Sequence, residues 1–171
     1  MNAGTGGSPI SIGARERWTL RAAVPGDLDA LKRVRDESAR HACGAVYSPA
    51  QLAAWLARPL PAKMRALIDA ACVLVAESDG EIIGYGAIDL ATAEIEAVFV
   101  APGAMGSGLG RRLLHQLEDI ARANDVRALS LSASLNAVPF YRRAGYVTTS
   151  RGQFPLDEHQ FLEFERMEKR G

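Results

Sequence analysis

The sequence predicts a single domain of mixed α/β (or α+β) class, in which one mixed sheet is flanked by helices. Three observations carry this prediction: apolar or alternating runs of strand length, apolar residues at helical spacing between several of these runs, and turn residues at the junctions. A chain of 171 residues, of which 48% are hydrophobic, has the length and the apolar content for one core.

The first half of the chain is predicted to contain one strand followed by helices. Residues 1–16 are rich in Gly and Ser and are expected to form a disordered leader, so the domain is expected to span residues 17–171. Residues 17–21 alternate between polar and apolar and predict the first strand. Ser48-Pro49 predicts a helix start, because Ser caps helices and Pro favours the first helical position. Helices are expected from Leu28 onward, over 50–57 and over 63–70.

The second half of the chain is predicted to supply the rest of the sheet and a long helix. Asp79-Gly80 is a hairpin signal between two strands, and Gly145 is typical of a residue that ends a helix. Strands are expected over 71–76, 81–90, 94–100, 127–132, 146–149 and 160–167, and helices over 109–124 and 136–144.

Composition argues against several classes of protein. The chain has 20 basic and 20 acidic residues, and a formal net charge of zero argues against nucleic acid or an anionic membrane as the partner. No apolar run reaches the roughly 18 residues that a membrane-spanning helix needs. The cysteines Cys43 and Cys72 and three scattered histidines form no metal-spaced group. We therefore expect no metal, no membrane span and a reducing, cytoplasmic setting.

A glycine-rich turn separates the strand that ends at Val100 from the long helix. Gly106, Gly108 and Gly110 let the backbone bring several N–H groups to one anion. The helix N-terminus adds partial positive charge, and Arg111 adds a full one. The spacing is neither that of a P-loop nor that of a dinucleotide-binding βαβ unit. A phosphate-binding loop and a plain strand-to-helix turn both remain possible for these residues.

Two motifs together resemble those of the GNAT superfamily of N-acetyltransferases. The first is similar to the family's acyl-CoA-binding motif and reads Val98-x-Val100-x-Pro102, then Gly106-x-Gly108-x-Gly110-Arg111-x-Leu113-Leu114. The second runs from Asn136 to Tyr146, with Asn opening a helix and Tyr141 four residues before a Gly-aromatic pair. The motifs occur in the family's order with a strand between them, and the resemblance covers roughly residues 71–149.

The resemblance implies acetyl-CoA as the acyl donor and a GNAT-like fold. In that fold the sheet is mostly antiparallel and splays between its fourth and fifth strands. The pyrophosphate would lie on the loop, and the pantetheine arm would lie along the open strand edge. The residues implied for the cofactor are Val98, Phe99, Val100, Met105, Gly106, Ser107, Gly108, Leu109, Gly110, Arg111, Asn136 and Tyr141.

The expected cofactor contacts of Met105 and Asn136 differ from those of the other residues in this set. The family usually has Arg or Gln at the position of Met105, and a methionine side chain cannot donate to phosphate. Its remaining contribution would be its backbone N–H. Asn136 is expected to cap its helix as well as to contact the pantetheine, and the capping role alone would explain it.

The implied reaction is direct transfer of the acyl group from the thioester to an amine. The amine must be neutral to attack, so a carboxylate on the central strand is expected to take its proton. Glu96 is the first choice and Glu94 the second. They are two residues apart and are predicted to share a face of the strand, where either one could instead be solvated or salt-bridged. A backbone N–H of the strand near Val98 to Val100 is expected to donate to the oxyanion. Tyr141 is expected to protonate the leaving thiolate, although it could also be a core aromatic.

The resemblance places the acceptor amine, a small molecule or a peptide, between the N-terminal helices and the central strands. That region offers His41, Tyr47, Trp55, Tyr85 and Asp89, each of which also has a structural explanation. Residues 77–104 hold six acidic and no basic side chains, which predicts a cationic acceptor.

Two alternatives remain open from the sequence. The protein could be a catalytically silent module that binds acyl-CoA as a sensor or partner domain, and Met105 is the feature that points that way. The apolar residues Phe161, Leu162 and Phe164 suit either a homodimer interface or a strand inside the sheet.

Overall fold

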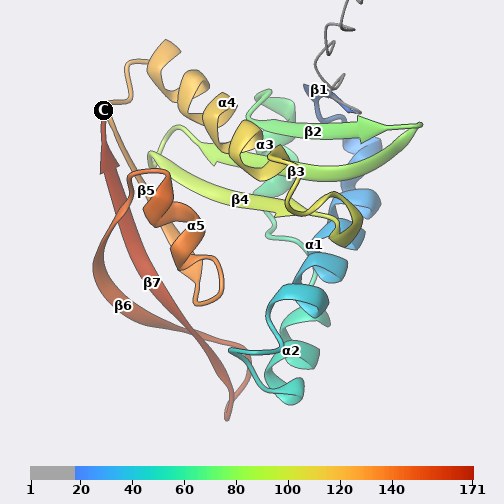
Figure 1. The fold of residues 1–171 in the computed structure, drawn as a ribbon, viewed down its shortest axis with the longest axis vertical. Helices are drawn as coiled ribbons and strands as arrows, with labels where there is room; N and C mark the ends of the chain where they lie inside the picture. The colour runs from blue at the N-terminus through green and yellow to red at the C-terminus, as the bar shows by residue number, and fades with distance from the viewer. Residues whose placement is uncertain (1–17) are drawn as a thin grey trace, which may run out of the picture.

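Seven strands form one sheet in the order β1-β2-β3-β4-β5-β7-β6 in the computed structural model, which describes residues 18–171 (Figure 1). Neighbouring strands are antiparallel except β4 and β5, which are parallel. The strands are β1 (Thr19–Ala22), β2 (Val73–Ser78), β3 (Glu81–Asp89), β4 (Glu94–Val100), β5 (Ala128–Ser134), β6 (Val147–Pro155) and β7 (Phe161–Arg170). The expected leader, residues 1–16, lies outside the described residues.

Helices cover both faces of the half of the sheet that β1 to β4 form (Figure 1). On one face, Leu109 and Leu113 of α4 pack with Val98 and Val100 of β4. On the other face, Leu31 of α1 lies in the core beside Tyr85 of β3. The helices are α1 (Leu28–Ala42), α2 (Pro49–Leu56), α3 (Met64–Asp69), α4 (Leu109–Ala123) and α5 (Val138–Arg143), with 3-10 turns η1 (Pro25–Asp27) and η2 (Pro102–Ala104).

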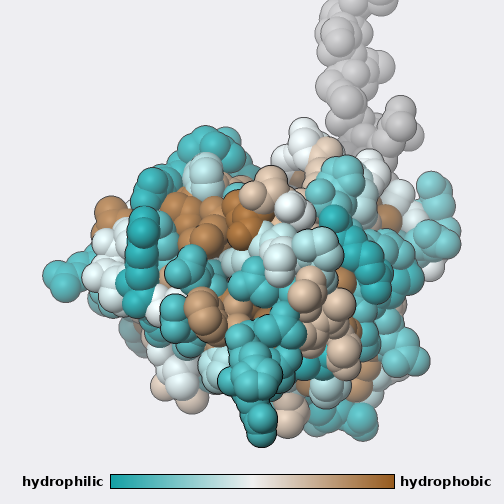
Figure 2. All heavy atoms as spheres, turned by 90° about the horizontal axis from the view of Figure 1, so that it is seen from below, coloured by the Kyte–Doolittle hydropathy of each residue, from teal (hydrophilic) through white to brown (hydrophobic). Residues whose placement is uncertain are grey.

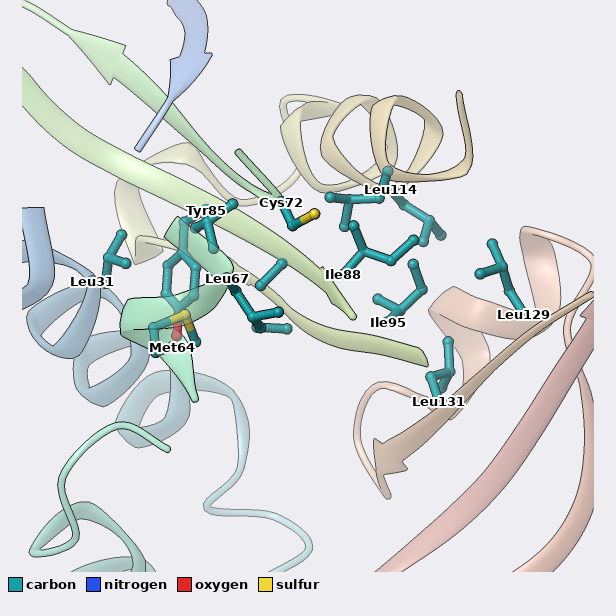
Figure 3. Close-up of a cluster of buried hydrophobic side chains, with 14 of the residues drawn as sticks. Leu31, Met64, Leu67, Cys72, Tyr85, Ile88, Ile95, Leu114, Leu129 and Leu131 are labelled. Atoms are coloured by element: carbon teal, nitrogen blue, oxygen red, sulfur yellow. The ribbon is translucent and has the colours of Figure 1, made fainter. Parts of the chain in front are cut away.

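The main core runs from α1 and α3 through the central strands to β5, as Figure 3 shows. Its labelled side chains are Leu31, Met64, Leu67, Cys72, Tyr85, Ile88, Ile95, Leu114, Leu129 and Leu131. Burial of one fully enclosed leucine or isoleucine side chain contributes on the order of 1.5–3 kcal/mol. This core therefore fixes β3 and β4, the strands that carry the candidate site.

Local sequence explains why α4 lies so close to β3. Its buried residues Leu109, Leu113, Leu117 and Ala121 recur at helical spacing and form one apolar stripe. Gly86 of β3 lies under this stripe, and a Cβ there would be 2.9 Å from Leu117 Cδ1. Because no real Cβ tolerates such a contact, glycine at this position lets the helix approach the strand.

The hairpin of β6 and β7 crosses to the N-terminal helices and joins the two halves of the molecule beyond the point where the sheet opens (Figure 1). Gln51 Nε2 donates to the Phe161 carbonyl at 2.8 Å, and Tyr47 Oη donates to the Glu163 carbonyl at 2.6 Å. The same Tyr47 oxygen accepts the Leu135 N–H at 3.0 Å. The tip of the hairpin is thereby held against α2.

Several element predictions are confirmed. The predicted strand over 94–100 matches β4, and the long helix is α4. Ser48 caps α2 through a capping box with Gln51. The predicted mixed sheet is confirmed: its pairing is mostly antiparallel, and β4 and β5 are parallel.

Three details differ from the prediction. β6 runs from Val147 to Pro155 and so extends six residues beyond the end of the predicted strand 146–149, because pairing with β7 along its length compensates for its weak alternation. β2 starts at Val73 because Ala71 has φ 55° and turns the chain out of α3. The helix predicted over 136–144 starts at Val138, and Asn136 makes no capping hydrogen bond. Within residues 18–171, no helix is long and apolar enough to cross a membrane.

Candidate active site

The site begins where β4 separates from β5. These strands pair at two positions, Glu94 with Ser130 and Ile95 with Leu131, and β4 then continues to Val100 without a partner on that side. On its other side β4 pairs with β3, and the Ala101 N–H donates to the Ile83 carbonyl. Antiparallel alternation then places the polar backbone groups of Val98 and Val100 on the open edge and those of Phe99 toward β3. The edge therefore offers N–H and C=O groups to an extended ligand.

The start of α4 lies beside this edge and forms a set of N–H donors. Gly106, Gly108, Gly110 and Arg111 have no backbone hydrogen-bond acceptor among the described residues. Gly106 and Gly108 have φ values of 77° and 87°, a region that favours glycine. Such a run of free N–H groups at the start of a 15-residue helix suits a phosphate group. We call these four residues the N–H cradle.

The cradle, the open edge and α5 meet at Gly110. A Cβ on Gly110 would lie 3.6 Å from the Phe140 ring and 3.6 Å from Val100 Cγ2. The start of α4 is thus packed between the end of β4 and the helix that carries Tyr141. A ligand with its phosphate group in the cradle could extend along the open edge at Val100 and Val98 and pass close to α5.

Substitution of Gly108 tests the cradle. Gly108→Val is expected to raise the dissociation constant of coenzyme A roughly 5- to 30-fold, because a side chain at positive φ costs on the order of 1–2 kcal/mol and is relieved by moving the loop. Isothermal titration calorimetry measures this change. Gly103→Ala is the matched control, since Gly103 lies in η2 with no atom within 4 Å of an added Cβ. Equal affinities for the two variants would contradict the assignment.

Three residues that were expected to bind the cofactor make hydrogen bonds within the protein instead. The Met105 N–H donates to the Pro102 carbonyl at 3.2 Å, so Met105 lies next to the cradle without adding a donor. Ser107 Oγ donates to the Ala104 carbonyl at 2.6 Å and accepts the Leu109 N–H at 3.4 Å, which stabilises the loop. The predicted capping role of Asn136 is wrong, because Asn136 Oδ1 instead accepts from the Cys43 thiol at 3.2 Å.

A β-bulge turns Glu96 away from α4. Ala87 pairs with Ala97 and Ile88 pairs with Ile95, so Glu96 is an extra residue without a partner in β3. The alternation that puts Val98 and Val100 against α4 is broken there. Glu96 consequently lines a cavity on the opposite face of the sheet, together with Phe99.

Glu96 is a shielded carboxylate with one cationic partner. Its side chain is 13% exposed, and it accepts a hydrogen bond from Lys63 Nζ. Lys63 also donates to Asp89 Oδ2 at 3.3 Å. Burial raises the pKa of Glu96 above its usual value, and the Lys63 ammonium opposes part of that increase. A carboxylate with a raised pKa is suited to accept a proton.

Glu94 belongs to a different ion pair. Arg166 of β7 donates to Glu94 Oε1 at 2.5 Å and to Ser130 Oγ at 2.8 Å. This contact joins β4 to β7 across β5 close to the place where the sheet opens. The structure therefore gives the two predicted carboxylates different surroundings, and only Glu96 of the pair lines the cavity.

Lys63 is expected to set the pH dependence that Glu96 confers. Removing its positive charge in Lys63→Met raises the pKa of Glu96 further, so Glu96 holds its proton to higher pH. The acidic limb of kcat/KM is then expected to move to higher pH.

Lys63→Arg retains the charge and is expected to leave the limb close to its wild-type position. Profiles of kcat/KM against pH are compared between variants with one acceptor, because the acceptor's own ionisation affects all variants equally. A limb that does not move in Lys63→Met would show that Glu96 is not the titrating group.

Tyr141 lies on α5 with its ring in the core and its hydroxyl free. The residue is 7% exposed, and its ring centroid is 4.9 Å from Phe140 and 5.8 Å from Tyr146. Its hydroxyl has no hydrogen-bond partner among the described residues. Every fully buried polar side-chain atom of those residues does have a partner. The hydroxyl therefore reaches solvent-accessible space. Burial raises the pKa of Tyr141, which keeps the phenol protonated at neutral pH.

The cavity beside Glu96 has a volume of about 530 Å³. It lies between the α2–α3 segment, the central strands and the tip of the β6–β7 hairpin. Figure 2 views the molecule from below and shows hydrophobic patches among hydrophilic side chains on that face. Its lining residues are Arg35, Trp55, Arg58, Pro59, Leu60, Pro61, Ala62, Lys63, Met64, Tyr85, Glu96, Ala97, Phe99 and Phe154.

Of the five acceptor candidates from the sequence, Trp55 and Tyr85 line this cavity. Asp89 contacts it indirectly through Lys63, whereas Tyr47 holds the hairpin and His41 is exposed at the end of α1. Sequence reasoning missed Lys63, Arg58 and Phe154. No local motif marks them, because the cavity forms only when residues about a hundred positions apart come together. Among residues 18–171, no group of three or more His, Cys, Asp or Glu side chains could hold a metal.

Known proteins resemble this chain in sequence and in fold. The model of the acetyltransferase (GNAT) domain family matches residues 43–170. An IAA acetyltransferase of Azospirillum brasilense is 39% identical over 88 residues, which are 47% of this chain and 56% of that protein. The chain therefore matches little more than half the length of this curated relative.

Solved structures resemble nearly the whole chain. A GCN5-related N-acetyltransferase from Rhodopseudomonas palustris superposes with a TM-score of 0.77 at 25% identity, covering 90% of this chain and 95% of that one. The PaiA N-acetyltransferase of Thermoplasma acidophilum, in complex with coenzyme A, superposes with a TM-score of 0.72 at 20% identity, covering 90% and 99%. The latter likeness shows the shared fold.

Proposed function

Because this chain belongs to the GNAT acetyltransferase family, we propose that it transfers an acetyl group from acetyl-CoA to a primary amine by direct attack on the thioester. The observation that carries the proposal is the convergence of three features around β4. These are the N–H cradle, the open edge at Val98 and Val100, and the shielded carboxylate of Glu96.

The cofactor fits this site because the chain leaves donors for it. Gly106, Gly108, Gly110 and Arg111 hold the pyrophosphate through their free N–H groups, and the Arg111 side chain adds charge. Val98 and Val100 pair with the pantetheine amides along the open edge. When bound, acetyl-CoA supplies the thioester that the amine attacks.

The residues around the edge then perform three tasks. Glu96 takes a proton from the acceptor ammonium, so that the neutral amine can attack. A backbone N–H of the open edge, at Val98 or Val100, donates to the carbonyl oxygen as it becomes negative. The Tyr141 hydroxyl donates its proton to the leaving sulfur. Holding both reactants in contact contributes on the order of 7 kcal/mol or more in favourable cases.

Thiol release tests this function directly. The chain is incubated with acetyl-CoA and a panel of primary amines, and free coenzyme A and the acetylated amine are measured by a thiol reagent and mass spectrometry. We expect release that requires both substrates.

A second function, silent binding of acyl-CoA, has one observation in its favour: Met105 supplies neither a polar side chain nor a free N–H. Tight coenzyme A binding without release from any amine would select that alternative. No heat of binding at millimolar coenzyme A would contradict both.

A further inference from the structure

The charges that line the cavity are mostly positive. Arg35, Arg58 and Lys63 line it against a single carboxylate, Glu96. The sequence-based expectation of a cationic acceptor rested on the six acidic residues of 77–104. Of these six, Glu96 is the one that lines the cavity. Glu77, Glu94 and Asp89 are bound to Arg21, Arg166 and Lys63 respectively. The local charge therefore does not follow the charge of the segment.

Of the three cationic side chains, Arg58 is the one with side-chain nitrogen atoms that have no hydrogen-bond partner among the described residues. Arg35 is 4% exposed and its three nitrogens bond Asp36 and the carbonyls of residues 56, 58 and 59. Lys63 bonds Glu96 and Asp89. Arg58 uses Nη1 for the Pro155 and Leu156 carbonyls at 2.9 and 3.2 Å. Its Nη2 and Nε have no partner among the described residues.

Arg58 is also held in place at the cavity wall. Its guanidinium carbon lies 5.1 Å from the centroid of the Phe154 ring, and two carbonyls of the hairpin tip fix one nitrogen. A guanidinium oriented in this way keeps two donors directed elsewhere, which suits a carboxylate or another planar anion.

Aromatic side chains line the same cavity as Arg58 and Glu96. The Phe99 ring is near both Trp55 and Tyr85, with ring centroids 6.5 and 5.6 Å away. Tyr85 is 1% exposed, and its hydroxyl has no partner among the described residues. Every fully buried polar side-chain atom of the described residues has a hydrogen-bond partner. The unpartnered Tyr85 hydroxyl is therefore accessible from the cavity that Tyr85 lines. Figure 3 shows the Tyr85 ring extending from β3 toward α3.

From this arrangement we propose that the acceptor is an amine with a flat apolar body and a carboxylate at its far end. The amine lies at Glu96, the body lies against Phe99 and Trp55, and the carboxylate lies at Arg58. The Tyr85 hydroxyl supplies a hydrogen bond along the length of the ligand. This inference rests on the proposed acetyl transfer and names the substrate class of that same cavity.

Matched acceptors test the proposal. The probes are 4-(2-aminoethyl)benzoate, its methyl ester and the polyamine spermidine, each assayed with acetyl-CoA by thiol release. The carboxylate compound is expected to have a kcat/KM at least about tenfold above that of the ester, through a lower KM. Spermidine is expected to be the poorest acceptor, because two further ammonium groups would face Arg58 and Lys63.

Two variants locate the preference. Arg58→Gln is expected to reduce the ratio of kcat/KM for the carboxylate compound over its ester roughly tenfold. Arg65→Gln is the control, since Arg65 is an exposed arginine of α3 that does not line the cavity, and it is expected to retain the wild-type ratio.

Release with the ester or spermidine preferred, or an unchanged ratio in Arg58→Gln, would overturn the substrate class and leave the acetyl transfer standing. Absence of release from every amine would overturn the acetyl transfer and this proposal with it.

Discussion

Glu96→Gln is expected to lower kcat/KM at neutral pH by roughly 10²- to 10⁴-fold, the range that a positioned general base supplies. The amide has nearly the shape of the carboxylate and its oxygen still accepts from Lys63, so the bulge and the cavity are expected to persist. What it loses is the capacity to accept a proton. Steady-state kinetics with a saturating acetyl-CoA concentration measure the loss, and calorimetry with coenzyme A is expected to show an unchanged affinity.

Glu94→Gln is the matched control for this prediction. Glu94 lies on the same strand but pairs with Arg166, and its removal is expected to change kcat/KM much less than removal of Glu96 does. The pH profile separates the two further, because the acidic limb is expected to disappear in Glu96→Gln alone. Equal losses in both variants would show that the ion pairs around β4 matter only for structure.

The sequence predicted the parts of the site that are local. The glycines at 106 and 108 indicated a turn with positive φ, and the apolar spacing behind them indicated α4. Both depend on residues within one or two turns of the chain. The same holds for the Ser48 cap of α2, which a short range of sequence determines.

The orientation of Glu96 was beyond such reasoning. Strict alternation puts residues 96, 98 and 100 on one face, and α4 would then cover Glu96. The bulge reverses this for Glu96 while it leaves Val98 and Val100 against Leu109 and Leu113. A bulge depends on how two strands match in register, so the sequence of β4 alone does not contain it.

The net charge counted along residues 77–104 does not describe the lining of the cavity, for a related reason. Counting charges along residues 77–104 treats them as free, whereas Glu77, Glu94 and Asp89 are paired with cations that come from other parts of the chain. The arginine that matters for the cavity is positioned by carbonyls 97 and 98 residues further along the chain. Segment charge predicts local potential only where tertiary ion pairs do not cancel it.

Tyr141→Phe is expected to lower kcat by roughly 10²-fold, at the lower end of the general-acid range. The ring stays packed against Phe140 and Tyr146, so the variant is expected to fold and to bind coenzyme A with unchanged affinity. Turnover is slowed rather than abolished, because water can protonate the departing thiolate and the positioning of both reactants is retained. Kinetics at saturating substrates, with calorimetry for coenzyme A, measure both quantities.

Tyr146→Phe distinguishes a chemical role from a packing role. Both tyrosines lie in the same aromatic group, but the Tyr146 hydroxyl is committed to Glu118 Oε1 at 3.1 Å, whereas that of Tyr141 has no partner in residues 18–171. Loss of the Tyr146 hydroxyl is expected to lower the thermal midpoint of unfolding and to leave kcat close to that of the wild type, since a typical hydrogen bond contributes about 1 kcal/mol to stability. Loss of the Tyr141 hydroxyl is expected to lower kcat and to leave the thermal midpoint close to that of the wild type, because it breaks no hydrogen bond in the folded protein. A Tyr141→Phe variant with wild-type kcat would remove Tyr141 from the mechanism and assign protonation of the thiolate to water.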